Sequence, residues 1–341
     1  MLILLSSAHS PRYREDILRC LAAPIGSIVQ FRYDKRWIAN ELVDRVERGE
    51  LALPSSGIVC YVDLQGAGPL TMIPVRSVRV ERINVHGRTV SIGLRMKEFN
   101  YAEPVVFTKE LFDLSGNVSP QKINDEVEGK YLFEVDSLPV SLKTGQTVGD
   151  WEEVVVLLRD QAAFADEPFF WTVVGAHLEG SKMDSNVFSE WPQKPISDPF
   201  DLLVYHYQPK PGPRIDSKLT ISTGSSLERS GPSEIDIDSR YDLKRWRLYP
   251  EPSGYSARET WIRIRTADRW NLDLSVTVKG PFGRTLAKAV VAGALIAVPS
   301  IITILTQKDV SETMRMVISG VSLVSGILAA SAVVFSIEKL A

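Results

Sequence analysis

Hydrophobic and polar residues alternate through much of the first hundred positions, a pattern typical of half-buried β-strands. Residues 27–33, SIVQFRY, alternate strictly. Gly87 can supply the positive φ that a tight hairpin turn needs, so it predicts a turn between two strands. Further short strands are predicted at residues 57–64, 70–75, 77–85 and 88–96.

Two helices are predicted among these strands. The chain opens with an apolar run too short for a secretory signal peptide, which predicts a first strand, and Ser10 and Pro11 then predict a helix start. A second helix is expected over residues 36–50, where apolar residues recur at four-residue spacing. Residues 1–100 are therefore expected to form a small, basic, β-rich α+β or barrel domain.

A second strand-rich block follows an acidic connecting region at residues 101–150. Its segments are short, apolar and separated by links rich in proline, glycine and serine, which is typical of a β-sandwich. The sandwich is expected over residues 151–280, with strands at 152–159, 168–178, 200–207, 218–223, 243–249, 260–266 and 272–278.

Two long apolar runs near the end of the chain predict a transmembrane helical hairpin at residues 284–341. The helices are expected at about 286–306 and 316–337. The second run holds 22 uncharged residues. As a helix it spans roughly 33 Å, against about 30 Å of bilayer hydrocarbon. The alternative is a hairpin buried in a soluble core or dimer interface, but such helices normally keep a polar face. The fold class expected is mainly β with some α.

Positive charges flank this hairpin more than they occupy its link, which by the positive-inside rule predicts an inner-membrane protein with both termini cytoplasmic. Small residues at helical spacing would let helices approach closely in lipid. Two helices per subunit cannot enclose a water path, so a pore would need several copies, and a homo-oligomer is expected. A pore and a plain two-helix anchor fit equally well. The candidate pore or helix-packing residues are Gly293, Ala297, Pro299, Ser319, Ser322, Gly326 and Ala330.

Composition and motifs argue against an enzyme. The net charge is −3, and the two cysteines, Cys20 and Cys60, offer no disulfide framework. The four histidines lack metal-ligand spacing, and no phosphate-binding glycine loop or nucleophile elbow is present. Acidic residues gather at 234–242, where strand alternation favours a solvated face over a cation site. We therefore expect no catalytic residue, metal or cofactor.

The best candidate for recognition is FRYDKRW, residues 31–37, where cations and aromatics interleave. Phosphates need lysine or arginine donors and bases need flat surfaces, so this composition suits a nucleotide or single-stranded oligonucleotide. Ordinary strand solubility and contact with anionic lipid are the alternatives. The candidate ligand-binding residues are Phe31, Arg32, Tyr33, Lys35, Arg36, Trp37, Arg79 and Arg82.

The order of parts and the runs AVVAGALIAVPSIITIL and MVISGVSLVSGILAASAVVFSI resemble the two-helix membrane effectors of bacterial anti-phage defence, the Hailong type among them. The resemblance implies an oligomeric channel that a nucleotide or oligonucleotide ligand controls, together with a partner enzyme that makes the signal. It carries over no functional residue. A membrane-anchored adaptor that binds other proteins is the alternative function.

Overall fold

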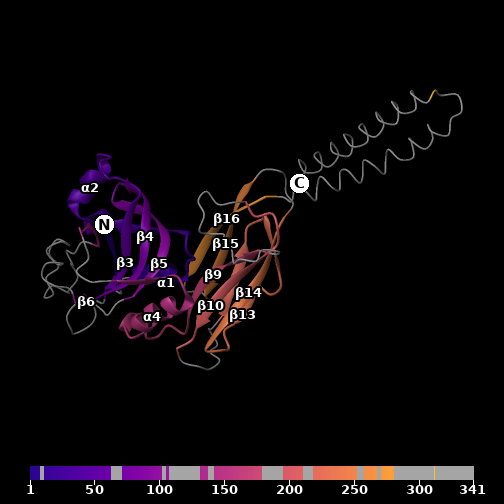
Figure 1. The fold of residues 1–341 in the computed structure, drawn as a ribbon. Helices are drawn as coiled ribbons and strands as arrows, with labels where there is room; N and C mark the ends of the chain where they lie inside the picture. Colours follow the sequence, from indigo (N-terminus) through magenta and orange to yellow (C-terminus); the bar gives the residue numbers. More distant parts are fainter. Residues whose placement is uncertain are drawn as a thin grey trace.

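The protein is described from a computed structural model (Figure 1). The description covers residues 1–7, 11–62, 71–101, 105–106, 131–136, 142–178, 195–209, 218–251, 257–266, 270–279 and 311.

The first part of the chain builds one mixed β-sheet of eight strands, in which β2, β5, β4, β3, β1 and β7 lie side by side. β1 runs parallel to β3, while the other pairs are antiparallel. β4 is one long strand with irregular register where two shorter strands are predicted. The strands are β1 (Leu2–Ser7), β2 (Ile28–Asp34), β3 (Ser55–Val62), β4 (Thr71–His86), β5 (Thr89–Tyr101), β6 (Val105–Val106), β7 (Leu132–Glu134) and β8 (Lys143–Gly145).

Within the described ranges, three α-helices accompany this sheet: α1 (Pro11–Ala22), α2 (Asn40–Glu47) and α4 (Val148–Arg159). Short 3-10 turns lie at Lys35–Trp37 and Ala162–Phe164. α4 corrects the strand predicted at 152–159. The Thr147 side chain accepts from the Asp150 amide, and the Asp150 carboxylate accepts from the Thr147 amide. This reciprocal capping box starts a helix.

The second part is a β-sandwich of two four-stranded sheets, as the short apolar segments and their proline-, glycine- and serine-rich links predict. Trp171 and Trp270 stack inside it, with ring centroids 4.8 Å apart. One sheet has the order β12-β14-β10-β9, from β9 (Phe170–Leu178), β10 (Phe200–Tyr207), β12 (Leu227–Ser230) and β14 (Tyr241–Pro250). The other has the order β13-β11-β15-β16, from β11 (Lys218–Thr223), β13 (Glu234–Asp236), β15 (Arg258–Thr266) and β16 (Asn271–Val278).

Helix α1 joins the two parts, because it packs on the first sheet and also contacts β9 and β16 of the sandwich (Figure 1). Trp151 of α4 makes a second link: its indole donates to Leu21 O at 3.2 Å and meets the Tyr205 ring of β10 edge-on. Arg14 of α1 forms an ion pair with the buried Glu167 carboxylate. The interface therefore combines apolar packing with directional contacts.

The predicted membrane architecture requires correction. None of the helices in the described ranges has the length and apolar character needed to cross a bilayer. The inner-membrane, two-helix prediction is therefore not supported, and neither is the fold class that included the hairpin. The predicted spans 286–306 and 316–337 lie outside the described ranges, as do Gly293, Ala297, Pro299, Ser319, Ser322, Gly326 and Ala330. The β-rich part of that fold class agrees with the structure.

Candidate functional site: a groove between the two parts

A groove runs between strand β2 of the first sheet and strand β16 of the sandwich. Strands β2 and β16 each lie at one end of the strand order of their sheet. Two neighbouring cavities, of about 550 Å³ and about 690 Å³, share Ile28 and Asp273 in their walls. We call the first the arginine pocket, after Arg12, Arg19 and Arg32, and the second the tryptophan pocket, after Trp261. Together they form the interdomain groove.

Local periodicity places the side chains of the arginine pocket. On α1, helical spacing puts Arg12, Asp16 and Arg19 along one face, while Ile17 and Leu21 are buried. On β2, alternation sends every second side chain toward the pocket. The pocket therefore collects polar groups from a helix face and a strand face, and both elements remain anchored in the core.

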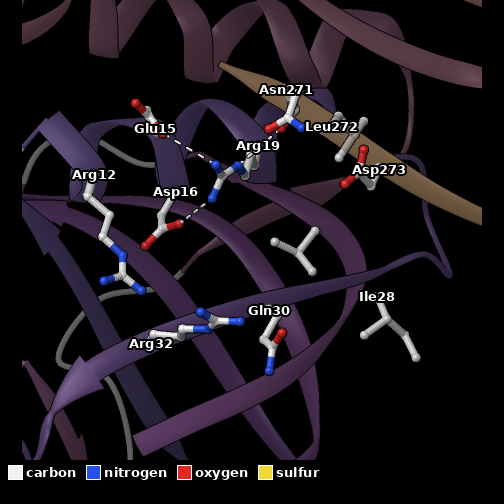
Figure 2. A pocket seen from close by; sticks show the side chains of 11 residues that line it. Arg12, Glu15, Asp16, Arg19, Ile28, Gln30, Arg32, Asn271, Leu272 and Asp273 are labelled. Carbon is white, nitrogen blue, oxygen red and sulfur yellow. Dashed lines mark hydrogen bonds and ion pairs between the residues drawn. The ribbon is translucent and has the colours of Figure 1, made fainter. Parts of the chain in front are cut away.

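Arg19 is held in place by both parts of the protein. Its guanidinium contacts Asp16 at 3.2 Å and Glu15 at 3.3 Å, and its Nε donates to Asn271 O of β16 at 3.1 Å (Figure 2). All the donor directions of a guanidinium lie in one plane. With three acceptors around it, Arg19 is a structural cross-link rather than an open ligand donor.

Arg12 and Arg32 differ from Arg19. Both side chains are exposed, and neither makes a hydrogen bond or an ion pair with another group in the described ranges. Figure 2 shows Arg12 from α1 and Arg32 from β2 reaching into the same space, with Asp16 and Gln30 beside them. Two guanidinium groups that converge without a protein acceptor provide donors for an external anion.

Asp16 controls the charge of this pocket. Burial raises the pKa of its carboxyl to about 7, although the charges of Arg19 and Arg12 oppose that rise. At a pH below 7 the Asp16 carboxyl is largely neutral, and it then cancels less of the positive charge around it. The arginine pocket is therefore more attractive to anions in mildly acidic than in mildly alkaline solution.

The tryptophan pocket continues the groove with a different surface. Arg82 lies across Gly93, where a Cβ atom would approach the Arg82 side chain to 2.8 Å, so glycine leaves the room that this side chain occupies. Arg82, like Arg12, makes no hydrogen bond or ion pair with another group in the described ranges. The Trp261 indole is 43% exposed on the opposite wall. This half of the groove therefore offers the Arg82 cation and a flat aromatic surface, while its second arginine, Arg95, is ion-paired with Glu81.

The predicted FRYDKRW cluster does not act as one surface. Phe31 and Tyr33 are buried in the core, Lys35 pairs with Glu47 at 2.5 Å, and Arg36 stacks on the Trp37 ring. Arg32 is the one residue of this segment that lines the groove. Of the two arginines predicted outside the segment, Arg79 pairs with Glu81 at 3.7 Å, and Arg82 lines the tryptophan pocket.

Two lysines form ion pairs with acidic residues of segment 234–242. Lys218 lies 3.7 Å from Glu234, and Lys244 lies 3.2 Å from Asp242 and 3.4 Å from Asp238. In the part of the chain that the structure describes, no three metal-ligating side chains come together. We therefore interpret this segment as a charged surface with lysine ion pairs and not as a cation site.

The sequence-based prediction missed Arg12, Asp16 and Trp261. Arg12 and Asp16 lie four positions apart, at the spacing that places them on one helix face. That spacing is common on solvated helices, so it could have placed the two residues together but could not have assigned them to a groove. Trp261 alternates with buried residues in β15, which marks it as an outward aromatic side chain.

Comparisons with known proteins add little. No family model and no curated protein matches the chain. Among solved structures, the crystal structure of a FixG-related protein from Vibrio parahaemolyticus is similar over 34% of this chain and 98% of its own length. The identity is 7% and the TM-score 0.23, values at which the likeness supports neither a fold nor a function.

Proposed function

We propose that this chain is a ligand-binding protein whose interdomain groove takes a phosphate-bearing ligand of the nucleotide or oligonucleotide class. The observation that carries the proposal is that Arg12 and Arg32 line one cavity of about 550 Å³, and that neither makes a hydrogen bond or an ion pair with another group in the described ranges. A planar guanidinium can contact two phosphate oxygens at once, which makes arginine well suited to this ligand class.

The tryptophan pocket extends the same proposal to the base. An exposed indole provides a face on which a nucleobase can stack, and Arg82 lies in the same cavity. A ligand with both a phosphate and a base would use the two pockets together. Since the walls come from β2 and β16, such a ligand would also hold the two parts of the protein in one arrangement.

The channel activity expected from the resemblance is not part of this proposal, because it depended on the transmembrane hairpin. Oligomerisation and a partner enzyme that supplies the ligand stay predictions.

Replacing Arg12 or Arg32 by alanine should weaken binding of a fluorescein-labelled single-stranded DNA oligonucleotide by about tenfold each at low salt. Each loss removes one phosphate contact, so the slope of log affinity against log salt should also fall by about 1. Fluorescence anisotropy measures both quantities. Competition with ATP and with inorganic pyrophosphate separates recognition of the base from recognition of phosphate alone.

Two variants of equal charge change serve as controls. Arg258→Ala removes an exposed arginine that lines neither pocket, and Arg36→Ala removes the exposed arginine stacked on Trp37. Both should bind like the wild type. If Arg36→Ala weakens binding as much as Arg32→Ala does, the site is the FRYDKRW segment rather than the groove. If no nucleotide or oligonucleotide binds the wild type at low salt, the proposal fails and a protein-binding adaptor becomes the better hypothesis.

A further inference from the structure

Five charged side chains of the described ranges line the tryptophan pocket, and two of them, one of each sign, form no ion pair. Glu81 pairs with Arg95 at 2.5 Å. Asp273 accepts two hydrogen bonds, of 2.5 Å and 3.0 Å, from an arginine of β15. Arg82 and Glu259 have no ion-pair partner in the part of the chain that the structure describes. The cavity therefore holds one cation and one carboxylate that no described protein charge neutralises.

Arg82 and Glu259 come from the two opposite walls of this pocket. Arg82 belongs to β4 of the first sheet and Glu259 to β15 of the sandwich, and both side chains are exposed. They line one cavity of about 690 Å³ but do not approach each other to ion-pair distance. A ligand that lies between them can therefore contact the cation on one side and the carboxylate on the other.

The Glu259 carboxylate is positioned by a neighbouring strand. One of its oxygens accepts a hydrogen bond from the Ser275 hydroxyl of β16, and within the described ranges its other oxygen accepts none. A carboxylate has about four acceptor sites, so Glu259 can still accept from two donors of a ligand. Glu259 and Trp261 lie two positions apart on β15, so their side chains leave the same face of the strand about 7 Å apart. A hydrogen-bond acceptor therefore lies beside the aromatic surface.

The Trp261 ring is held in place by its surroundings. The Arg263 guanidinium lies 5.3 Å from the ring centroid, and its two bonds to Asp273 hold that guanidinium in position. A Cβ atom at Gly224 would approach the indole nitrogen to 3.2 Å, so glycine at this position makes room for the ring. The exposed part of the indole is therefore a preformed surface on which a base can stack.

Guanine is the nucleobase whose hydrogen-bonding groups match both unpaired charges. Its N7 and O6 are adjacent acceptors, to which a planar guanidinium donates two hydrogen bonds. Its N1–H and 2-amino groups are adjacent donors, from which a carboxylate can accept. Adenine has an amino donor beside N7 and an unprotonated N1, so it would meet Arg82 with a donor and Glu259 with an acceptor. The pyrimidines lack both N7 and the 2-amino group.

We infer that the tryptophan pocket selects guanine: the base stacks on Trp261, Arg82 donates to N7 and O6, and Glu259 accepts from N1–H and the 2-amino group. The inference rests on the proposed function, because the phosphate of the same ligand lies in the arginine pocket, and it adds the identity of the base. A mismatched base leaves a donor or acceptor of the pocket without a partner, and this cost is what discriminates between bases.

Isothermal titration calorimetry with GMP, IMP and AMP tests the inference, since the three nucleotides share one sugar and one phosphate and differ in the base alone. GMP is expected to bind about tenfold more tightly than AMP. IMP keeps N1–H, O6 and N7 but lacks the 2-amino group, so its affinity should lie between the two. Equal affinities for GMP and AMP would overturn the inference and leave the proposed function intact, and so would binding of the labelled oligonucleotide without binding of GMP. Failure of the oligonucleotide and of all three nucleotides to bind would overturn both.

Two variants test whether Glu259 provides the preference. Glu259→Gln should bring the ratio of GMP affinity to AMP affinity close to 1, because a glutamine amide accepts from one ligand donor and presents its own donor to the other. AMP should bind this variant at least as tightly as the wild type, whereas damage to the fold would weaken both nucleotides. Glu228→Gln changes an exposed glutamate of β12 that lines neither pocket, and it should keep the wild-type ratio. A wild-type ratio in Glu259→Gln would contradict the assignment.

Discussion

Replacing Trp151 by alanine is expected to lower the free energy of unfolding by about 3–5 kcal/mol, the range for deletion of a fully buried aromatic side chain. Trp151 has no exposed surface, its indole donates to Leu21 O at 3.2 Å, and its ring meets Tyr205 edge-on at 5.7 Å between centroids. The variant therefore loses apolar burial, a buried hydrogen bond and an aromatic contact between the two parts. Urea denaturation followed by circular dichroism measures the change.

Two further variants separate these contributions. Trp151→Phe keeps an aromatic ring but leaves Leu21 O without its donor, so a smaller loss of about 1–3 kcal/mol is expected. Trp261→Ala removes a tryptophan that is 43% exposed, and its effect should stay near 0.5 kcal/mol. If Trp151→Ala costs no more than Trp261→Ala, Trp151 does not hold the two parts together.

Strand positions were predictable wherever one face of a strand is buried. In β2 the side chains of Phe31 and Tyr33 are buried while Gln30 and Arg32 are exposed, and this contrast is visible in the sequence as alternation. The same contrast is present in β15 and β16, whose burial alternates along the strand. Burial on one face selects apolar residues at every second position, so the pattern reports the environment directly.

The failure at α4 has a specific physical cause. The run EEVVVLLR is rich in β-branched residues, which favours a strand. In the structure Trp151, Val154, Val155 and Leu158 are buried at helical spacing, because that face packs on the first sheet. Tertiary packing outweighed intrinsic preference, and the capping pair Thr147 and Asp150 was the local signal of a helix.

The candidate site was predictable only in part, because its walls meet through tertiary structure. Arg19 and Asn271 are hydrogen-bonded although they lie 252 positions apart, and no local pattern connects them. Composition selected Arg32 within a cluster of cations and aromatics, but alternation turns its aromatic neighbours into the core. Interleaved residue types on one strand therefore do not form one surface.

Asp16 is expected to make the protein less stable as the pH rises, and Asp16→Asn should remove this effect. The carboxyl titrates near pH 4 in an unfolded chain, whereas burial raises its pKa to about 7 in the folded protein. Between these values the folded state binds the proton more tightly than the unfolded state. Stability therefore falls by about 1.4 kcal/mol per pH unit from pH 4 to 7, and the penalty levels off above pH 7 near 4 kcal/mol.

Urea unfolding of wild type and Asp16→Asn at pH 5, 6, 7 and 8 measures this penalty, since asparagine keeps an acceptor for Arg19 without the charge. The variant should become progressively more stable than the wild type up to about pH 7. Asp273→Asn is the matched control, because it removes a half-exposed carboxylate of the same pocket, and the exposed ion pair that Asp273 forms with Arg263 contributes little to stability. A difference between wild type and Asp16→Asn that stays constant with pH would show that Asp16 is ionised in the folded protein throughout. In that case the arginine pocket would not gain positive charge in mildly acidic solution, and its affinity for anions would lose the pH dependence that a buried, protonated Asp16 implies.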